Sequence, residues 1–115
     1  MSISSADSLG LRYQGVLTTT DITTVATVGA NKTYSAIKVS FSNNSISTGA
    51  LAEVYLVPPG QSATNDYRIL PPTLVPAETE MEFSCPHELT AGFTVQVKAS
   101  VANLLTCMAS ARELS

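Results

Sequence analysis

The stretch Phe93-Thr94-Val95-Gln96-Val97-Lys98-Ala99-Ser100-Val101 alternates apolar and polar side chains from its first residue to its last. Successive side chains of a β-strand point to opposite faces, so this alternation predicts a strand with one buried face and one exposed face. It is the longest run of its kind in the sequence. Because a half-buried strand needs other elements to cover its apolar side, it predicts a layered β fold.

Further runs with strand composition flank residues 93–101 and are separated by breaks rich in Gly, Pro and Asn. We expect strands over residues 11–20, 22–28, 33–42, 50–57 and 67–70, around Met81 and Phe83, and after Asn103. This gives about eight short strands and no clear helix. The predicted fold is all-β: a single antiparallel β-sandwich of jelly-roll or similar Greek-key type.

The same alternation predicts which side chains face the core. The expected inward positions are Ile37, Val39, Phe41, Ala52, Val54, Leu56, Met81 and Phe83. The expected outward positions include Glu53 and Tyr55 and an acidic, solvated face made by Glu78, Glu80 and Glu82. Pro58-Pro59 and Pro71-Pro72 are expected to end the strands before them, because proline cannot donate to a strand ladder.

Two periods compete in the C-terminal segment. The apolar residues Val101, Leu104, Leu105, Met108 and Ala111 fit one stripe of a helix. A strand is the preferred interpretation, because Ala102-Asn103 can close a tight hairpin with the preceding strand. That strand places Leu105, Cys107 and Ala109 inward, and a terminal helix remains the alternative.

The chain has 115 residues, which is enough for one core and too few for two. We expect an extended N-terminal arm over residues 1–10 and one sandwich domain over residues 11–115. Only 13% of the residues are charged, whereas 14 serines and 14 threonines supply most of the polar surface. Mean hydropathy is +0.20. A weakly charged, hydroxyl-rich surface suits a protein that neighbours cover on several sides, where buried charges would be costly.

Composition argues against several classes of partner. The net charge is −3 and the basic residues are scattered, whereas nucleic-acid binders need clustered Lys and Arg. No apolar run approaches the roughly 20 residues of a membrane helix. Met1 to Asp7 lacks the basic and apolar regions of a secretory signal, so we expect synthesis in a cytoplasm.

Little in the sequence indicates catalysis. Cys85 and His87 are close enough in sequence to suggest a nucleophile and base, but a surface or turn histidine is the preferred interpretation. Cys85 and Cys107 are expected to be buried, inert thiols, since their spacing fits no metal or redox motif. Asp7, Asp21 and Asp66 belong to no calcium-binding pattern and are expected to be cap and turn residues. We therefore predict no catalytic residue, no cofactor and no metal site.

Several segments resemble small structural proteins of tailed phages. The first is Val54-Tyr55-Leu56-Val57-Pro58-Pro59-Gly60-Gln61-Ser62-Ala63 with the following Asn65-Asp66-Tyr67-Arg68-Ile69-Leu70, where a strand ends at a Pro/Gly turn before a polar stretch and a second apolar run. The others are Ala77 to Phe83, Leu89 to Gly92 and Ala109 to Leu114. Together they cover roughly the C-terminal two-thirds of the chain.

This resemblance implies a virion protein: a capsid decoration or cement protein that bridges major capsid protein subunits, or a component of the neck or tail. It also implies a homo-oligomer, a dimer or trimer, whereas the composition predicts no nucleic-acid or membrane partner. A glycan-binding β-sandwich module is the alternative, although a chain with no Trp offers a poor platform for sugar stacking. The residues expected to contact the partner are Gln61, Ser62, Thr64, Asn65, Asp66, Tyr67 and Arg68 in a polar loop, and Ser2, Ile3 and Ser4 in the arm.

Overall fold

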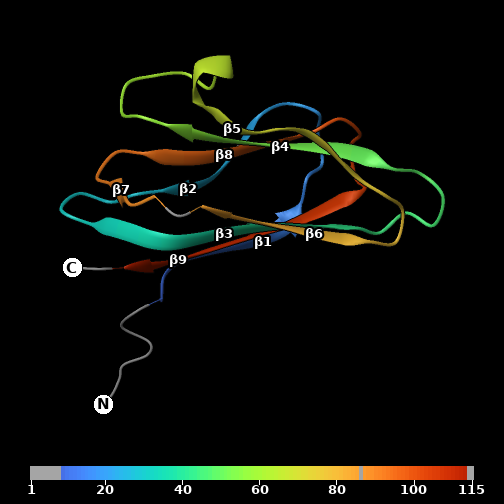
Figure 1. The fold of residues 1–115 in the computed structure, drawn as a ribbon, viewed down its shortest axis with the longest axis horizontal. Coiled ribbons are helices and arrows are strands. Elements are labelled where there is room, and N and C mark those ends of the chain that lie inside the picture. Colours follow the sequence, from blue (N-terminus) through green and yellow to red (C-terminus); the bar gives the residue numbers. More distant parts are fainter. Residues whose placement is uncertain (1–8, 86, 114–115) are drawn as a thin grey trace, which may run out of the picture.

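The computed structural model describes residues 9–85 and 87–113, which form two antiparallel sheets packed face to face (Figure 1). The strands are β1 Leu9–Val16, β2 Thr23–Thr27, β3 Thr33–Asn43, β4 Ala50–Val57, β5 Arg68–Val75, β6 Glu80–Cys85, β7 Leu89–Thr90, β8 Thr94–Ala99 and β9 Leu105–Glu113. A single 3-10 turn, η1 Asn65–Tyr67, precedes β5. The predicted all-β sandwich is confirmed.

The strands pair as one long ribbon that has been rolled up. β1 pairs with β9, β2 with β8, β3 with β6 and β4 with β5, so each pair encloses the next one along the chain. Rolling brings β3 beside β9 and β4 beside β8. The resulting sheets have the orders β1-β9-β3-β6 and β2-β8-β4-β5, with the short β7 added beside the start of β3. This nested antiparallel pairing is the jelly-roll arrangement.

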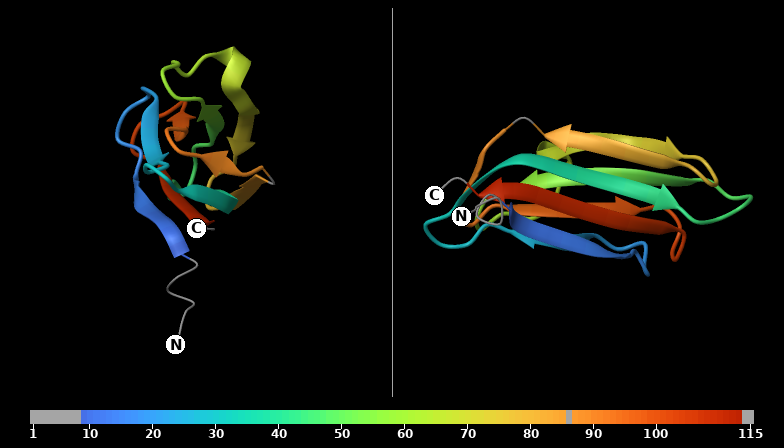
Figure 2. Two further views of the ribbon diagram at one scale, coloured as in Figure 1. Left: turned by 90° about the vertical axis from the view of Figure 1, so that its left-hand side faces the viewer. Right: turned by 90° about the horizontal axis from the view of Figure 1, so that it is seen from below.

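The core lies between the two sheets, as the view along the strands shows (Figure 2). The predicted inward positions of β3 and β4 are buried: Ile37, Val39 and Phe41 are at most 1% exposed, and Ala52 and Val54 are fully enclosed. Val95, Val97 and Ala99 of β8 are buried in the same way. The alternation of residues 93–101 therefore encodes the face that meets the opposite sheet, although β8 itself is shorter than that run.

The C-terminal segment is a strand, as preferred, and Leu105, Cys107 and Ala109 face the core. The predicted hairpin with the preceding strand is wrong, because β8 and β9 belong to different sheets. Residues 100–104 cross between the sheets, and the Asn103 amide donates to the Leu17 carbonyl (2.9 Å). Inserted between β1 and β3, β9 gains ladder hydrogen bonds on both sides, which a terminal hairpin would not supply.

Pro71-Pro72 does not end a strand, contrary to the prediction. β5 continues through both prolines to Val75. β5 is an edge strand, where a missing amide donor leaves no ladder bond unmade. The prolines also sit in a bulge, since Ala52 lies opposite Thr73 whereas Val54 lies opposite Leu70. Both proline rings are exposed.

A second bulge lies in β3, where the strand changes its outer partner from β7 to β6. Ser35 lies opposite Arg112 and Lys38 opposite Ser110, so β3 carries one residue more than β9 over this interval. Ala36 accommodates the extra residue with a φ of 52°, in the left-handed region. A Cβ atom disfavours this region by roughly 1 kcal/mol or more.

Asn43 is the buried polar side chain of the described residues, at 4% exposure. Its Nδ2 donates to the carbonyls of Thr48 and Val75 (both 2.9 Å), and its Oδ1 accepts from the Ser45 amide (2.9 Å). Its own amide donates to the Thr79 carbonyl (2.9 Å). The side chain thus joins the end of β3 to the end of β5 and to the two neighbouring loops.

Replacing Asn43 by alanine should lower the free energy of unfolding by about 3 kcal/mol, because three buried or half-buried backbone groups lose their partners. Urea denaturation measures this change. Asn44→Ala is the matched control, since Asn44 makes one exposed side-chain hydrogen bond, to Thr106, and should cost less than about 1 kcal/mol. Equal losses in the two variants would contradict this account of Asn43.

Ala36→Gly should raise the free energy of unfolding by about 0.5–1 kcal/mol, because relief of the left-handed strain exceeds the added entropy of the unfolded chain. The exposed methyl group of Ala36 contributes little packing. Ala52→Gly, at a fully buried strand position, should lower stability instead. A thermal melt of each variant decides the sign.

Candidate functional site

The polar loop between β4 and β5 is exposed where the sequence predicted a contact. Pro58-Pro59-Gly60 forms its turn, with the Gln61 amide donating to the Pro58 carbonyl (3.2 Å). Among the predicted contact residues, Gln61, Ser62, Thr64, Asn65 and Asp66 are exposed, and Tyr67 and Arg68 are half-buried. Ser2, Ile3 and Ser4 lie outside the described residues, and β1 begins at Leu9, inside the range predicted for the arm.

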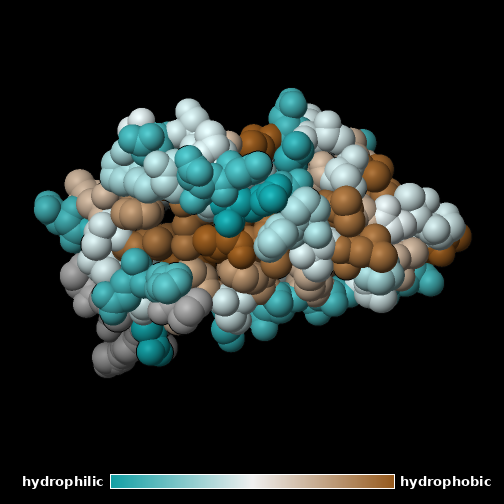
Figure 3. Space-filling view, turned by 45° about the horizontal axis from the view of Figure 1, so that its top comes forward, coloured by the Kyte–Doolittle hydropathy of each residue, from teal (hydrophilic) through white to brown (hydrophobic). Residues whose placement is uncertain are grey.

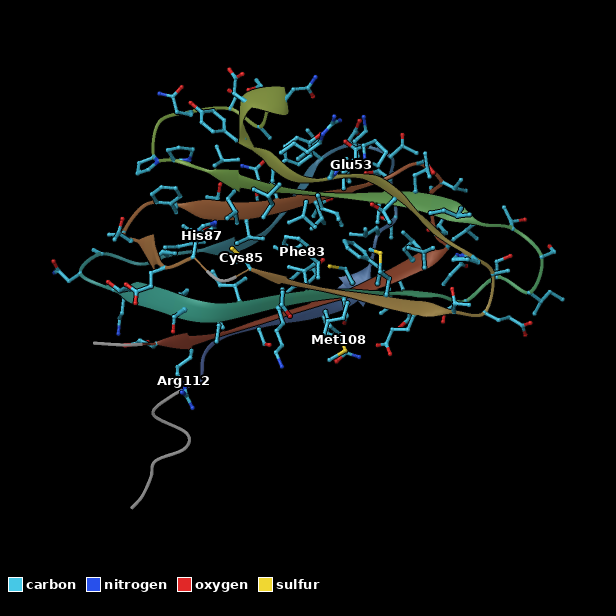
Figure 4. All side chains as sticks on the ribbon, viewed as in Figure 1. Glu53, Phe83, Cys85, His87, Met108 and Arg112 are labelled. Atoms are coloured by element: carbon cyan, nitrogen blue, oxygen red, sulfur yellow. The ribbon has the colours of Figure 1, made fainter. Side chains whose placement is uncertain are left out.

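A charged cluster lies beside this loop on the outer face of β4 and β5. The Tyr55 hydroxyl donates to Glu53 Oε1 (2.7 Å), and Arg68 Nη1 lies 3.3 Å from the same oxygen. Tyr55 was predicted to be on an exposed face, but it is only 5% exposed, because η1 and Arg68 lie against this part of β4. Burial raises the pKa of the Tyr55 phenol, and its hydrogen bond to Glu53 adds to the effect. The cluster attaches the start of β5 to β4, and Figure 4 shows Glu53 on this outer face.

The two thiols are buried, whereas the histidine is exposed. Cys85 and Cys107 are buried and unpaired with each other. Cys85 in β6 pairs with Ile37 on one side of β3, and Cys107 in β9 pairs with Phe41 on the other side. Ile37 and Phe41 are about 13 Å apart along β3. His87 is exposed at the bend after β6. Figure 4 shows Cys85 and His87 close to each other near the end of β6.

Burial raises the pKa of the Cys107 thiol to about 12, which disfavours the reactive thiolate. Within the described residues, no group of three or more His, Cys, Asp and Glu side chains is placed to hold a metal ion. No helix in this part of the chain has the length and hydropathy of a membrane span.

The most distinctive surface lies at the other end of the sandwich from the polar loop. Alternating strand directions bring four connections together there: residues 17–22, 44–49, 76–79 and 100–104. Five of the six exposed large apolar side chains among the described residues lie in or next to these connections: Val16 (45% exposed), Ile22 (38%), Ile46 (81%), Leu51 (39%) and Leu74 (57%). We call these five residues the apolar end.

The apolar end is poor in charge and is held together by hydrogen bonds. Its four connections contain two charged residues, Asp21 and Glu78. Backbone bonds join the connections to one another: the Glu78 amide donates to Ser45 (3.0 Å), Asn44 to Leu104 (3.0 Å) and Asn103 to Leu17 (2.9 Å). Figure 3 shows apolar atoms gathered over the ends of β4 and β5 on this side. Leu51 and Leu74 lie opposite each other on the outer face of one sheet, whereas Val16 lies on the outer face of the other sheet. The five side chains therefore share one end of the fold, and neighbouring exposed apolar pairs such as Leu51 and Leu74 are typical of protein-binding surfaces.

Sequence reasoning missed this surface, although two local signals point to it. Leu51 is an apolar residue out of phase with the inward positions of its strand, and it lies directly opposite Leu74 in β5. Ile46 is an apolar residue inside a loop of Asn, Ser, Thr and Gly. Neither signal shows that these residues meet at one end, because that depends on the topology.

Comparisons with known proteins add little to this picture. The chain matches no protein-family model, and no curated protein is significantly similar to it in sequence. A solved structure described as infectious bursal disease virus Gx strain is similar over 89% of this chain, with a TM-score of 0.46 and 12% identity. The match covers 31% of that viral chain. Similarity at this level carries no information on function.

The buried thiol of Cys107 should make the fold sensitive to alkali. In the unfolded chain the thiol ionises from its ordinary pKa of 9.0, but in the fold it stays protonated to about 12. Its contribution to stability is therefore complete below about pH 9 and is lost as the pH rises toward 12. From pH 8 to pH 10 the loss should be about 1.4 kcal/mol. Urea denaturation should show a smaller alkaline loss in Cys107→Ala, and an identical loss would contradict this origin.

Proposed function

We propose that this chain is a virion structural protein of a tailed phage, a capsid decoration or cement protein that bridges major capsid protein subunits. The apolar end is the observation that carries the proposal, because it presents large apolar side chains on a rigid, nearly uncharged platform. The resemblance of the loop and strands between Val54 and Phe83 to tailed-phage structural proteins supports it.

The energetics favour binding at this end. Fully burying one aliphatic side chain contributes about 1.5–3 kcal/mol, so covering the exposed parts of Leu51, Leu74 and Ile46 would stabilise a complex. The neighbouring residues are mostly Ser, Thr and Gly, so few charged groups would lose their hydration when the contact forms. An exposed apolar surface with few charges fits a protein partner better than a small soluble ligand.

A bridging protein needs two separated contact surfaces, and this chain offers two. The apolar end and the polar loop at residues 61–66 lie at opposite ends of the strands, because β4 runs from one to the other. Contacts at both ends would attach one shell subunit to its neighbour. Binding only to the assembled lattice would then stabilise the shell by mass action, without any chemical step.

The glycan-binding alternative has less support. Sugar rings stack on exposed aromatic side chains, but all four Tyr and three Phe residues of the chain are buried or half-buried. A role in the neck or tail fits the same surfaces as a shell role. The number of copies per particle separates these two positions, because a decoration protein follows the symmetry of the shell.

Mass spectrometry of purified virions should find this chain in numbers comparable with the major shell protein. In particles whose only source of this chain is a gene that carries Leu74→Ser, the number of chains per particle should fall several-fold. The reason is that the contact loses buried apolar area. Met108→Ser is the matched control, since Met108 is 40% exposed on the outer face of β9 and outside the apolar end. A few copies per particle would move the chain to the neck or tail, and its absence from virions would reject the proposal.

A further inference from the structure

Charge is scarce on the sheet made by β2, β8, β4 and β5. These four strands contain one acidic residue, Glu53, and two basic residues, Arg68 and Lys98. The residues on either side of Glu53 and of Lys98 in sequence are buried in the core, so both of these side chains lie on the outer face of the sheet. A single carboxylate therefore shares this face with two cations from different strands.

Glu53 has one of these cations on each side. Lys98 lies directly opposite it in β8, and the Cβ atoms of such a pair are about 5 Å apart. Arg68 comes from β5, where it lies opposite Tyr55, and its Nη1 is 3.3 Å from Glu53 Oε1. Lys98 forms no ion pair with any residue that the structure describes, and β2 on its other side carries no acidic residue. Glu53 is thus within reach of a second cation.

The cation that Glu53 contacts lies at the end of a loosely attached segment. Residues 60–67, which we call the flap, join β4 to β5 on the outer side of the sheet (Figure 1). The backbone hydrogen bonds of the flap are local, such as that from the Gln61 amide to the Pro58 carbonyl (3.2 Å), and none of them reaches β4. No residue of η1 is buried, and the ladder between β4 and β5 is irregular at this end. The contact of Arg68 with Glu53 therefore links the end of the flap to the outer face of β4.

The flap covers an aromatic side chain that its position in the strand would otherwise expose. Tyr55 is on the outer face of β4 but only 5% exposed, because η1 and Arg68 lie against it. Gly60 begins the flap with a φ of 79°, and no atom of another residue packs within 4 Å of the place where its Cβ would stand. Pro59, by contrast, is in close contact with Gly92, where a Cβ would lie 2.7 Å from Pro59 Cγ. The segment thus has a fixed base, an unpacked hinge and an ionic contact at its far end.

We propose that Glu53 exchanges between Arg68 and Lys98, and that this exchange closes and opens the flap over Tyr55. Partly exposed ion pairs are weak, so replacing one by the other changes the free energy little and both states are populated. In the closed state, which the structure shows, Glu53 holds Arg68 and Tyr55 is covered. In the open state Glu53 pairs with Lys98, Arg68 turns to water and Tyr55 becomes accessible. This device belongs to the isolated chain and does not depend on the proposed function.

Hydroxyl-radical labelling of Tyr55 in the purified full-length chain, measured by mass spectrometry, reports how often the ring is exposed. Arg68→Gln removes the cation of the closed state and should raise the labelling about five-fold. Lys98→Gln removes the cation of the open state and should lower the labelling about two-fold. Lys38→Gln is the matched control, because Lys38 is exposed on the other sheet, and it should leave the labelling unchanged.

A double-mutant cycle isolates the role of the carboxylate. In a Glu53→Gln background, Lys98→Gln should no longer change the labelling of Tyr55, because the neutral side chain forms an ion pair with neither cation. Lys98→Arg retains the charge and should behave as the wild type does. Urea denaturation of each variant separates local opening of the flap from a loss of global stability.

A purely static role for Arg68 predicts a different set of results. If Arg68 only covers the ring, Arg68→Gln raises the labelling of Tyr55 whereas Lys98→Gln leaves it unchanged, and that outcome overturns the exchange. An equal change in Lys38→Gln would also overturn it, because the effect would then follow net charge. A decrease in Lys98→Gln that disappears in the Glu53→Gln background is the result expected of the exchange.

Discussion

The hydrogen bonds of the Asn43 side chain lie where the core of this sandwich ends and its loops begin. One amide group satisfies carbonyls from the β3–β4 connection and from the end of β5, and it accepts the amide of Ser45. A buried polar group in so apolar a core is tolerable only when all its partners are present. The position of the 44–49 turn, which carries Ile46, and its attachment to the end of β5 depend on this constraint.

Local pattern was sufficient to predict the strands and their inward faces. Ile37, Val39 and Phe41, like Val95 and Val97, are buried because alternation along a strand is set by the backbone alone. Which strands pair with one another was not predictable in this way. Pro71-Pro72 predicts the end of a strand unless that strand is known to lie at the edge of its sheet. Ala102-Asn103 predicts a hairpin unless β9 is known to insert between β1 and β3.

The candidate site shows the same division. The exposure of five loop residues followed from composition, because polar side chains have little to bury: Gln61, Ser62, Thr64, Asn65 and Asp66. The burial of Tyr55 did not, since it depends on η1 and Arg68 reaching the outer face of β4. The apolar end was out of reach for a stronger reason: its residues come from four connections that are distant in sequence, and only the rolled ribbon brings them together.

The position of β9 also has a consequence for how the chain is made. β9 is the last of the described strands in sequence order, yet it lies inside its sheet, between β1 and β3. During synthesis, β1 and β3 emerge long before the strand that joins them, so the backbone edges that face β9 stay unpaired until residues 105–113 leave the ribosome. Contacts of such large sequence separation form slowly. The nascent chain thus depends on late closure, and the interval before closure is when it is most exposed to aggregation and to chaperones.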